Sequence, residues 1–320
     1  MSDLTEILEF EKPIKALEDK IQALQKVNQS DDDIHAAIQK LQTSLDKLKE
    51  KTFSHLTSNQ IVALARHPQR PHTSDYIKAL FTDVQILHGD RHDSDDAAMI
   101  TGLAKFQGQS CVVIGQEKGR DTHSRLQCNF GMPTPAGYRK ALRVMQLAER
   151  FKLPIFTFID TPGAYPGVRA EEQNQSEAIA KNLFEFSKCT SPIICTVIGE
   201  GGSGGALAIG VGDAILMCQY SIYSVISPEG CASILWKSAQ KAPDASEALQ
   251  LTAPQLLKHQ LIDAIVPEPQ CGAHSNMAQM ADHLRTALDQ ELKTLQALST
   301  EALLERRYER LMLNHLYTEQ

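Results

Sequence analysis

Apolar residues in the first part of the chain recur every three or four positions, with Lys, Glu, Asp and Gln between them. This period places the apolar side chains on one face of each of two amphipathic helices. The break falls at 28–33, where Ser30 and the acidic residues after it favour the start of the second helix. We therefore predict an antiparallel helical hairpin over residues 1–55, for packing or oligomerisation rather than ligand binding. Its apolar faces comprise Ile14, Leu17, Ile21, Leu24, Ile34, Ile38, Leu41, Leu45 and Leu48.

From residue 97 onward, short apolar runs alternate with longer amphipathic runs, which is typical of an α/β fold. The later apolar runs are almost continuous, as expected for a sheet covered on both faces. The interval between the runs at 155 and 193 fits a β-α-β crossover. We predict a second domain over 56–320, with strands at 100–106, 111–115, 155–159, 193–198, 214–218 and 221–226, and helices at 73–80, 136–152, 171–189, 205–211 and from about 243 onward.

The composition is that of an ordinary globular protein, with 42% hydrophobic and 22% charged residues among 320. The net charge of -7 argues against direct nucleic-acid binding, which depends on Lys and Arg neutralising phosphates. No run approaches the roughly 18 apolar residues that span a bilayer, and no signal-peptide pattern is present. The seven cysteines show no C-x-x-C spacing, so we expect neither a metal site nor a disulfide framework. These features predict a cytoplasmic protein.

Glycine is concentrated in one segment, 199–212, which holds seven of the 18 glycines and follows the predicted strand at 193. The spacing Gly199-x-Gly201-x-x-Gly204 matches the fingerprint of a dinucleotide-binding loop. Against this interpretation, no strand that ends in Asp or Glu follows at the distance that such a fold requires.

A second interpretation of the same segment is a nucleophile elbow, because Gly201-x-Ser203-x-Gly205 has the required spacing. A serine nucleophile needs an acid and a base, which Asp263 and His274 could supply in the right order. No motif frames either residue, so the elbow is supported by spacing alone.

The third interpretation uses the backbone of the glycine segment. Glycines permit close approach to backbone N–H groups, and a helix that begins there adds the positive end of its dipole. A second loop with two Gly and two Pro, at 160–167, follows the strand at 155. Because neighbouring parallel strands end at the same edge of a sheet, the loops 160–167 and 199–206 should meet and form oxyanion holes.

Several long motifs resemble the carboxyltransferase alpha subunits of bacterial acetyl-CoA carboxylases. The resemblance runs from about residue 5 to 312, and only the hairpin and parts of 240–300 are generic. It is carried by RDTH at 120–123, NFGMP at 129–133, GYRKALR at 137–143, FIDTPGAYPG at 158–167, GEGGSGGALAIG at 199–210, YSVISPEGCASILW at 223–236 and RRYERLM at 306–312.

This resemblance implies a crotonase/Clp-protease-like ββα superhelix with an N-terminal helical hairpin and C-terminal helices. It implies transfer of a carboxyl group from carboxybiotin, on the biotin carboxyl carrier protein, to acetyl-CoA, which gives malonyl-CoA for fatty acid synthesis. The implied partners are a beta subunit, which alone holds zinc, in an alpha2 beta2 assembly, and biotin carboxylase, which loads the biotin. The lack of C-x-x-C spacing agrees with this chain being alpha.

The resemblance also implies where the chemistry lies. Two oxyanions form during the transfer, and preorganised N–H donors can stabilise both while the cofactor handles the protons. We expect the backbone oxyanion holes at Gly204, Gly205, Gly163 and Ala164. We expect the carboxybiotin side of the site at Tyr165, Gly201 and Gly202.

Other residues keep two interpretations each. Tyr165 either stacks beside biotin or supports its own loop, and Glu200 either orients the glycine loop or holds a neighbouring N–H. Arg120 and Arg139 either attract CoA phosphates or form structural ion pairs. Ser227 fits a helix cap better than a catalytic group. Two other functions stay open: a serine hydrolase, which would depend on Ser203, and a scaffold or mRNA-binding protein, which would not need the glycine loop.

Overall fold

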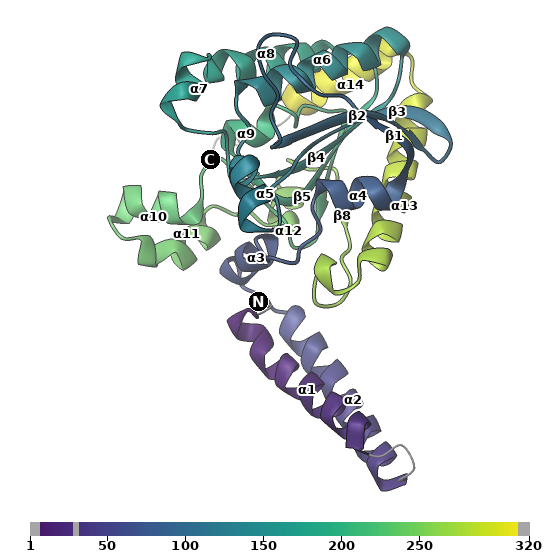
Figure 1. The fold of residues 1–320 in the computed structure, drawn as a ribbon, viewed down its shortest axis with the longest axis vertical. Coiled ribbons are helices and arrows are strands. Elements are labelled where there is room, and N and C mark those ends of the chain that lie inside the picture. Colours follow the sequence, from purple (N-terminus) through teal and green to yellow (C-terminus); the bar gives the residue numbers. More distant parts are fainter. Residues whose placement is uncertain (1–6, 28–31, 313–320) are drawn as a thin grey trace, which may run out of the picture.

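The computed structural model describes residues 7–27 and 32–312, which form a layered α/β body with a projecting pair of helices (Figure 1). The strands are β1 (Phe81–Ile86), β2 (Met99–Phe106), β3 (Gln109–Gln116), β4 (Ile155–Thr161), β5 (Ile193–Gly202), β6 (Ala214–Cys218), β7 (Ile222–Ser224) and β8 (Ala264–Val266). In the described residues they form one sheet in the order β1-β2-β3-β4-β5-β6-β8, with β7 paired to the carboxyl end of β5. Strands β1, β2 and β3 are antiparallel, and the sheet is parallel from β3 to β8.

Helices occupy most of the remaining chain. They are α1 (Lys12–Val27), α2 (Asp32–Phe53), α3 (Ser58–Ala65), α4 (Thr73–Leu80), α5 (Thr122–Gln127), α6 (Pro135–Phe151), α7 (Val168–Glu172), α8 (Gln175–Lys188), α9 (Ser203–Leu207), α10 (Pro228–Trp236), α11 (Ala242–Ala248), α12 (Ala253–Lys258), α13 (Met277–Gln296) and α14 (Thr300–Met312). Among the described residues, we find no helix with both the length and the apolar character needed to cross a membrane.

Helices cover both faces of the sheet, and two apolar cores result. On one face, Met145 of α6 packs in the same core as Ile159 of β4. On the other face, Leu284 of α13 shares a core with Phe158, the preceding residue of the same strand. Successive residues of a strand point to opposite faces, so both must be apolar. This explains why the predicted run at 155–159 is continuously apolar.

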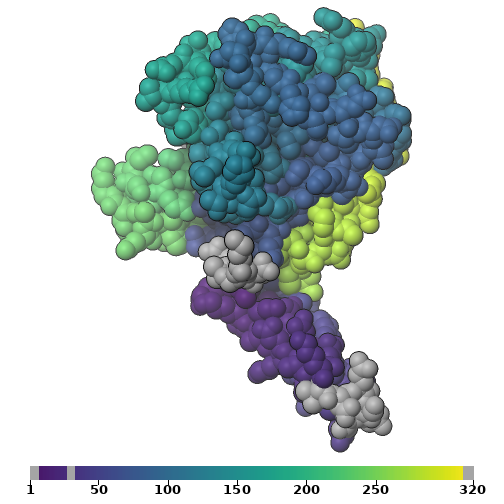
Figure 2. All heavy atoms as spheres, in the orientation of Figure 1, coloured from purple at the N-terminus to yellow at the C-terminus, as the bar shows by residue number. Residues whose placement is uncertain are grey.

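The helices α1 and α2 form the predicted N-terminal hairpin, which extends away from the body (Figure 2). Ile21 and Leu45 are buried in the apolar cluster that joins the two helices. The base of the hairpin is held by the body, because Phe53 shares that cluster with Leu64 of α3 and Tyr220. The predicted cap at Ser30 lies outside the described residues.

Some predicted elements have different bounds in the structure. The predicted helix at 171–189 is divided into α7 and α8, because Asn174 between them has a left-handed φ of 63°. The predicted helix at 205–211 is the shorter α9, which begins at Ser203, directly after β5, and already ends at Leu207. Only half of the residues of strand β1 are apolar and β8 has only three residues, so neither gives a long apolar run.

Candidate functional site

The loops 160–167 and 199–206 meet at the carboxyl ends of the parallel neighbours β4 and β5, as predicted. A Cβ atom on Gly205 would lie 2.5 Å from the carbonyl carbon of Gly163 and 2.6 Å from the amide nitrogen of Ala164. Only glycine allows backbone to approach backbone this closely. The first turn of α9 therefore lies directly against the 160–167 loop.

The loops differ in which N–H groups remain for a ligand. Those of Gly204 and Gly205 lie in the first turn of α9, where the helix itself supplies no acceptor. The N–H of Ala164 makes no hydrogen bond to any other described residue. By contrast, Gly163 donates its N–H to Thr161 Oγ1 at 3.0 Å. Gly163 thus uses its N–H within its own loop, and the available donors are Ala164, Gly204 and Gly205.

A buried ion cluster joins the bases of the two loops. Lys118 Nζ lies 2.7 Å from Asp160 Oδ1 and 2.8 Å from Glu200 Oε2. Arg66 donates to the other Glu200 oxygen at 2.5 Å and to Glu229 at 2.7 Å. Burial alone would raise the pKa of Glu200, but Lys118 and Arg66 outweigh it and lower this pKa to about 2. Glu200 is therefore an ionised anchor rather than a proton acceptor at neutral pH.

Sequence analysis missed the residues that anchor these loops from outside them, namely Arg66, Gln116 and Lys118. The available signal was a polar run, Gln-Glu-Lys at 116–118, directly after a continuously apolar strand. The cluster borders a cavity of about 260 Å³ that Arg66, Lys118, Asp160 and Glu200 help to line.

The 160–167 loop is also supported by Tyr165. A Cβ atom on Gly167 would lie 2.4 Å from the ring of Tyr165, so the ring folds back over its own loop. The Tyr165 N–H donates to the Pro133 carbonyl at 3.0 Å, and its carbonyl accepts from Gln175 at 3.0 Å. These contacts agree with the supporting role, one of the two that the sequence left open, and the role beside biotin stays a prediction.

The structure does not assemble a serine nucleophile. Ser203 is exposed and has a left-handed φ of 53° at the strand-to-helix turn, as an elbow would. However, the Asp263 carboxylate accepts from Arg310 at 2.9 Å. His274 instead stacks on His67, with ring centroids 3.9 Å apart. The acid and base that a triad needs are thus committed to other contacts.

The dinucleotide interpretation also fails on the geometry of the glycine segment. Helix α9 contains only 5 residues, from Ser203 to Leu207. A dinucleotide-binding loop leads into a long crossover helix that packs on the sheet and points its N-terminus at the pyrophosphate. No such helix follows the loop here.

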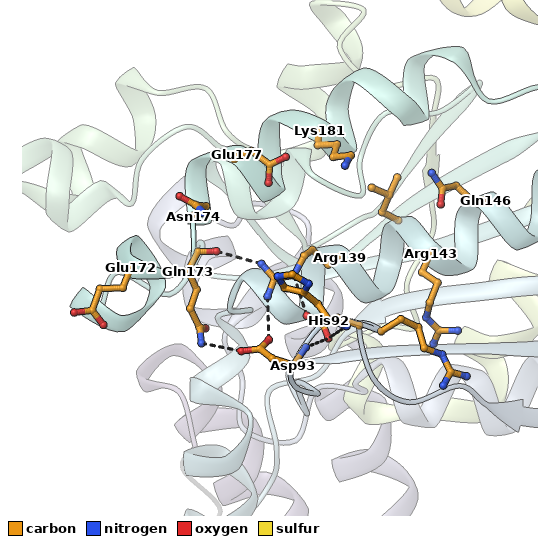
Figure 3. A pocket seen from close by; sticks show the side chains of 13 residues that line it. His92, Asp93, Arg139, Arg143, Gln146, Glu172, Gln173, Asn174, Glu177 and Lys181 are labelled. Atoms are coloured by element: carbon orange, nitrogen blue, oxygen red, sulfur yellow. Dashed lines mark hydrogen bonds and ion pairs between the residues drawn. The ribbon is translucent and has the colours of Figure 1, made fainter.

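The arginines considered for phosphate binding are in ion pairs. Arg120 pairs with Asp75. Arg139 Nε lies 2.8 Å from Asp90, and its NH2 lies 3.5 Å from Asp93, at the wall of a hollow of about 710 Å³ (Figure 3). Ser227 accepts the Gly230 N–H at 3.1 Å and so caps α10, as expected.

A family model described as "Acetyl co-enzyme A carboxylase carboxyltransferase-like" matches residues 7–314. The chain belongs to this family. An acetyl-coenzyme A carboxylase carboxyl transferase subunit alpha from Thioalkalivibrio sulfidiphilus is 60% identical over 308 residues, which cover 96% of this chain and 97% of that one. Its counterpart from Neisseria gonorrhoeae is 54% identical over 314 residues, 98% of each chain. The chain is thus a carboxyltransferase alpha subunit of acetyl-CoA carboxylase.

Solved structures of carboxyltransferases share the fold. Transcarboxylase 12S matches with a TM-score of 0.57 and 17% identity, over 71% of this chain and 42% of its own. A subunit of a Pseudomonas malonate decarboxylase hetero-tetramer matches with a TM-score of 0.56 and 14% identity, over 67% of this chain and 85% of its own. At such identities the likeness concerns the fold, and it confirms the predicted crotonase-like architecture of this carboxyltransferase.

Proposed function

We propose that this alpha subunit supplies one half of a site that transfers a carboxyl group from carboxybiotin to acetyl-CoA and forms malonyl-CoA. The observation that carries the proposal is the contact of Gly205 with Gly163 and Ala164, which brings N–H groups of two loops to one place. N–H donors fixed before the reaction stabilise developing negative charge without reorganisation. Relatives named as alpha subunits of the acetyl-CoA carboxylase carboxyl transferase support the choice of substrate.

The residues present fit a biotin ring with a charged ureido oxygen. Carboxybiotin on its carrier protein would supply the activated carboxyl group. The N–H groups of Ala164, Gly204 and Gly205 would donate to the ureido oxygen, and Gly201 and Gly202 would leave room beside it. Tyr165, half-buried on the same loop, would border the ring. No side-chain base is required from this chain, which agrees with Glu200 being held as an ion.

The partner in this proposal is a zinc-containing beta subunit in an alpha2 beta2 assembly, with the carrier protein and biotin carboxylase acting upstream. Support comes from the arm formed by α10 and α11, which projects from the body (Figure 2). The start of α10 lines a small pocket together with Gly201 and Gly202 of the glycine loop. Exposed apolar side chains are unusual for a surface: Ile234 and Leu235 of α10 are 61% and 64% exposed, and Val225, shortly before α10, is 76% exposed. We also place the protein in the cytoplasm, where its seven free cysteines would stay reduced.

The test is Gly205→Val in a complex with a zinc-ribbon beta subunit. The valine would collide with the Gly163 and Ala164 backbone, which cannot move aside as a flexible side chain would. Carboxyl transfer from malonyl-CoA to a soluble biotin derivative should fall by roughly 10²–10³ while the complex still assembles. Ser203→Ala is the control: a backbone oxyanion hole tolerates it, whereas a serine hydrolase would lose all activity. Wild-type transfer by Gly205→Val would overturn the proposal.

A further inference from the structure

We propose that Gln116 is a positioning residue that sets the separation of the two loops, an inference that rests on the function proposed above. Gln116 ends β3, and its side chain is fully buried. Its Nε2 donates to the Gly205 carbonyl oxygen at 2.8 Å. Its Oε1 accepts from the Asp160 N–H at 2.9 Å. One amide therefore connects the base of the 160–167 loop with the first turn of α9.

The backbone of Gln116 is held independently of both loops. It pairs with Met99 in the antiparallel ladder between β2 and β3. Its carbonyl oxygen accepts a hydrogen bond from the hydroxyl of Thr73 in α4. On its other side, β3 runs parallel to β4, with Gly115 opposite Phe158. Because the sheet fixes this backbone, the amide is a rigid reference for the two loops and does not move with either.

The two ends of this bridge require opposite chemistry. The Gly205 carbonyl can only accept a hydrogen bond, and the Asp160 N–H can only donate one. A carboxamide offers an NH₂ donor and a carbonyl acceptor on one flat group, so a single orientation of Gln116 satisfies both ends. A buried N–H or C=O group without a hydrogen-bond partner destabilises the folded protein, so these two bonds hold both loops close to the Gln116 amide.

The ion cluster ties the loops at a different place. Lys118 contacts the carboxylates of Asp160 and Glu200, and Asp160 Oδ1 also accepts the Glu200 N–H at 2.9 Å. These contacts join the ends of β4 and β5 but do not reach α9. Among the described residues, Gln116 is the side chain that hydrogen-bonds both the end of β4 and the helix that carries Gly205. Its loss should therefore misplace N–H donors without separating the strands.

The first experiment uses Gln116→Met, which keeps the length of the side chain and removes both hydrogen bonds. The variant is assembled with a zinc-ribbon beta subunit and supplied with malonyl-CoA and a free biotin derivative, which takes the carboxyl group and leaves acetyl-CoA. We expect kcat to fall about 10- to 100-fold, because small displacements of donors weaken transition-state stabilisation. The KM for malonyl-CoA should not change.

The matched control is Thr101→Val. Thr101 is also fully buried and donates to the Leu87 carbonyl at 2.7 Å, but it lies on β2 and contacts neither loop. It should lower thermal stability while kcat stays at the wild-type value. If Gln116→Met folds, assembles and keeps wild-type kcat, or if Thr101→Val loses as much kcat, the positioning role is refuted.

Gln116→Glu separates positioning from simple loss of packing. A protonated carboxyl at position 116 can donate to Gly205 and accept from Asp160, whereas an ionised one can no longer donate. The charged groups around it are Asp160, Glu200 and Lys118, with the His72–Glu117 pair on the far side. The ratio of variant to wild-type kcat should be near one at low pH and should fall as pH rises across about pH 6 to 9. A ratio independent of pH contradicts the proposal.

Comparison with Gly205→Val shows whether a negative result refutes the positioning role of Gln116 or the proposed function itself. If Gly205→Val abolishes transfer and Gln116→Met does not, the oxyanion hole is supported and the positioning role of Gln116 is refuted. If both variants retain wild-type transfer, the proposed function itself is wrong, and the inference falls with it.

Discussion

At the scale of single residues, the glycines of 199–212 have different tasks. A Cβ atom on Gly199 would lie 2.4 Å from the Asp160 carboxylate, one on Gly201 2.6 Å from the Tyr223 ring, and one on Gly202 2.3 Å from the Pro162 carbonyl oxygen. For these three, the missing side chain permits close packing. The sequence predicted the segment as a whole, but could not separate packing glycines from those that offer N–H donors.

The ion cluster leads to a prediction at the same scale. Lys118→Met would leave Asp160 and Glu200 buried without their shared cation, so the free energy of unfolding at pH 7 should fall by about 3 kcal/mol. The matched change Lys105→Met removes an exposed pair with Asp83 and should cost under about 1 kcal/mol. Urea denaturation of both variants measures the difference.

The pH dependence of this difference has a definite sign. Glu200 has a pKa of about 2 in the folded protein, below its ordinary 4.5. Its contribution to stability is therefore complete above about pH 4.5 and is lost as pH falls toward 2. Without Lys118 the pKa rises, so wild type and Lys118→Met should differ most near neutral pH and converge in acid. A gap that widens toward low pH would contradict this account.

At the scale of elements, a buried arginine helps to fix the C-terminal helix α14. Arg307 pairs with Asp213 at 2.7 Å and donates to the carbonyls of Phe186 and Cys189 at the end of α8. It thereby joins α14, α8 and the start of β6. The apolar period predicted the helix, and the arginine appeared in the sequence as part of the RRYERLM motif, with no sign that it is buried.

Arg307→Met tests how much this one side chain stabilises the C-terminal region. The substitution leaves the Asp213 carboxylate buried without its cation, so unfolding should become easier by about 3–5 kcal/mol. Arg306→Met, on the neighbouring and less buried residue, should change stability by under about 1 kcal/mol. Equal urea midpoints for the two variants would show that the buried pair contributes little.

At the scale of the whole molecule, the arm α10–α11 presents apolar residues near the glycine loop, where we propose one half of the site. Leu235→Glu should prevent association with the beta subunit, because a buried charge would replace apolar contact, and the isolated chain should keep its melting temperature. Phe151→Glu is the control, since Phe151 is 62% exposed at the far end of α6. Co-purification of each variant with a tagged beta subunit measures the outcome. Equal recovery of the beta subunit by both variants would show that the arm is not part of the interface.

The sequence by itself determined the class of fold, the hairpin, most strands and the two loops of the site. These follow from local pattern: the period of apolar residues, the position of Gly and Pro after strands, and long family motifs. Only the tertiary structure decided that Gly163 uses its N–H internally, that Glu200 is an ion, and that Gln116 and Lys118 brace the loops. The contacts of Glu200, Gln116 and Lys118 join residues more than 40 positions apart, and no local pattern encodes such contacts. The Gly163 bond reaches only to Thr161, but it depends on the orientation of one side chain, which the residue types do not specify.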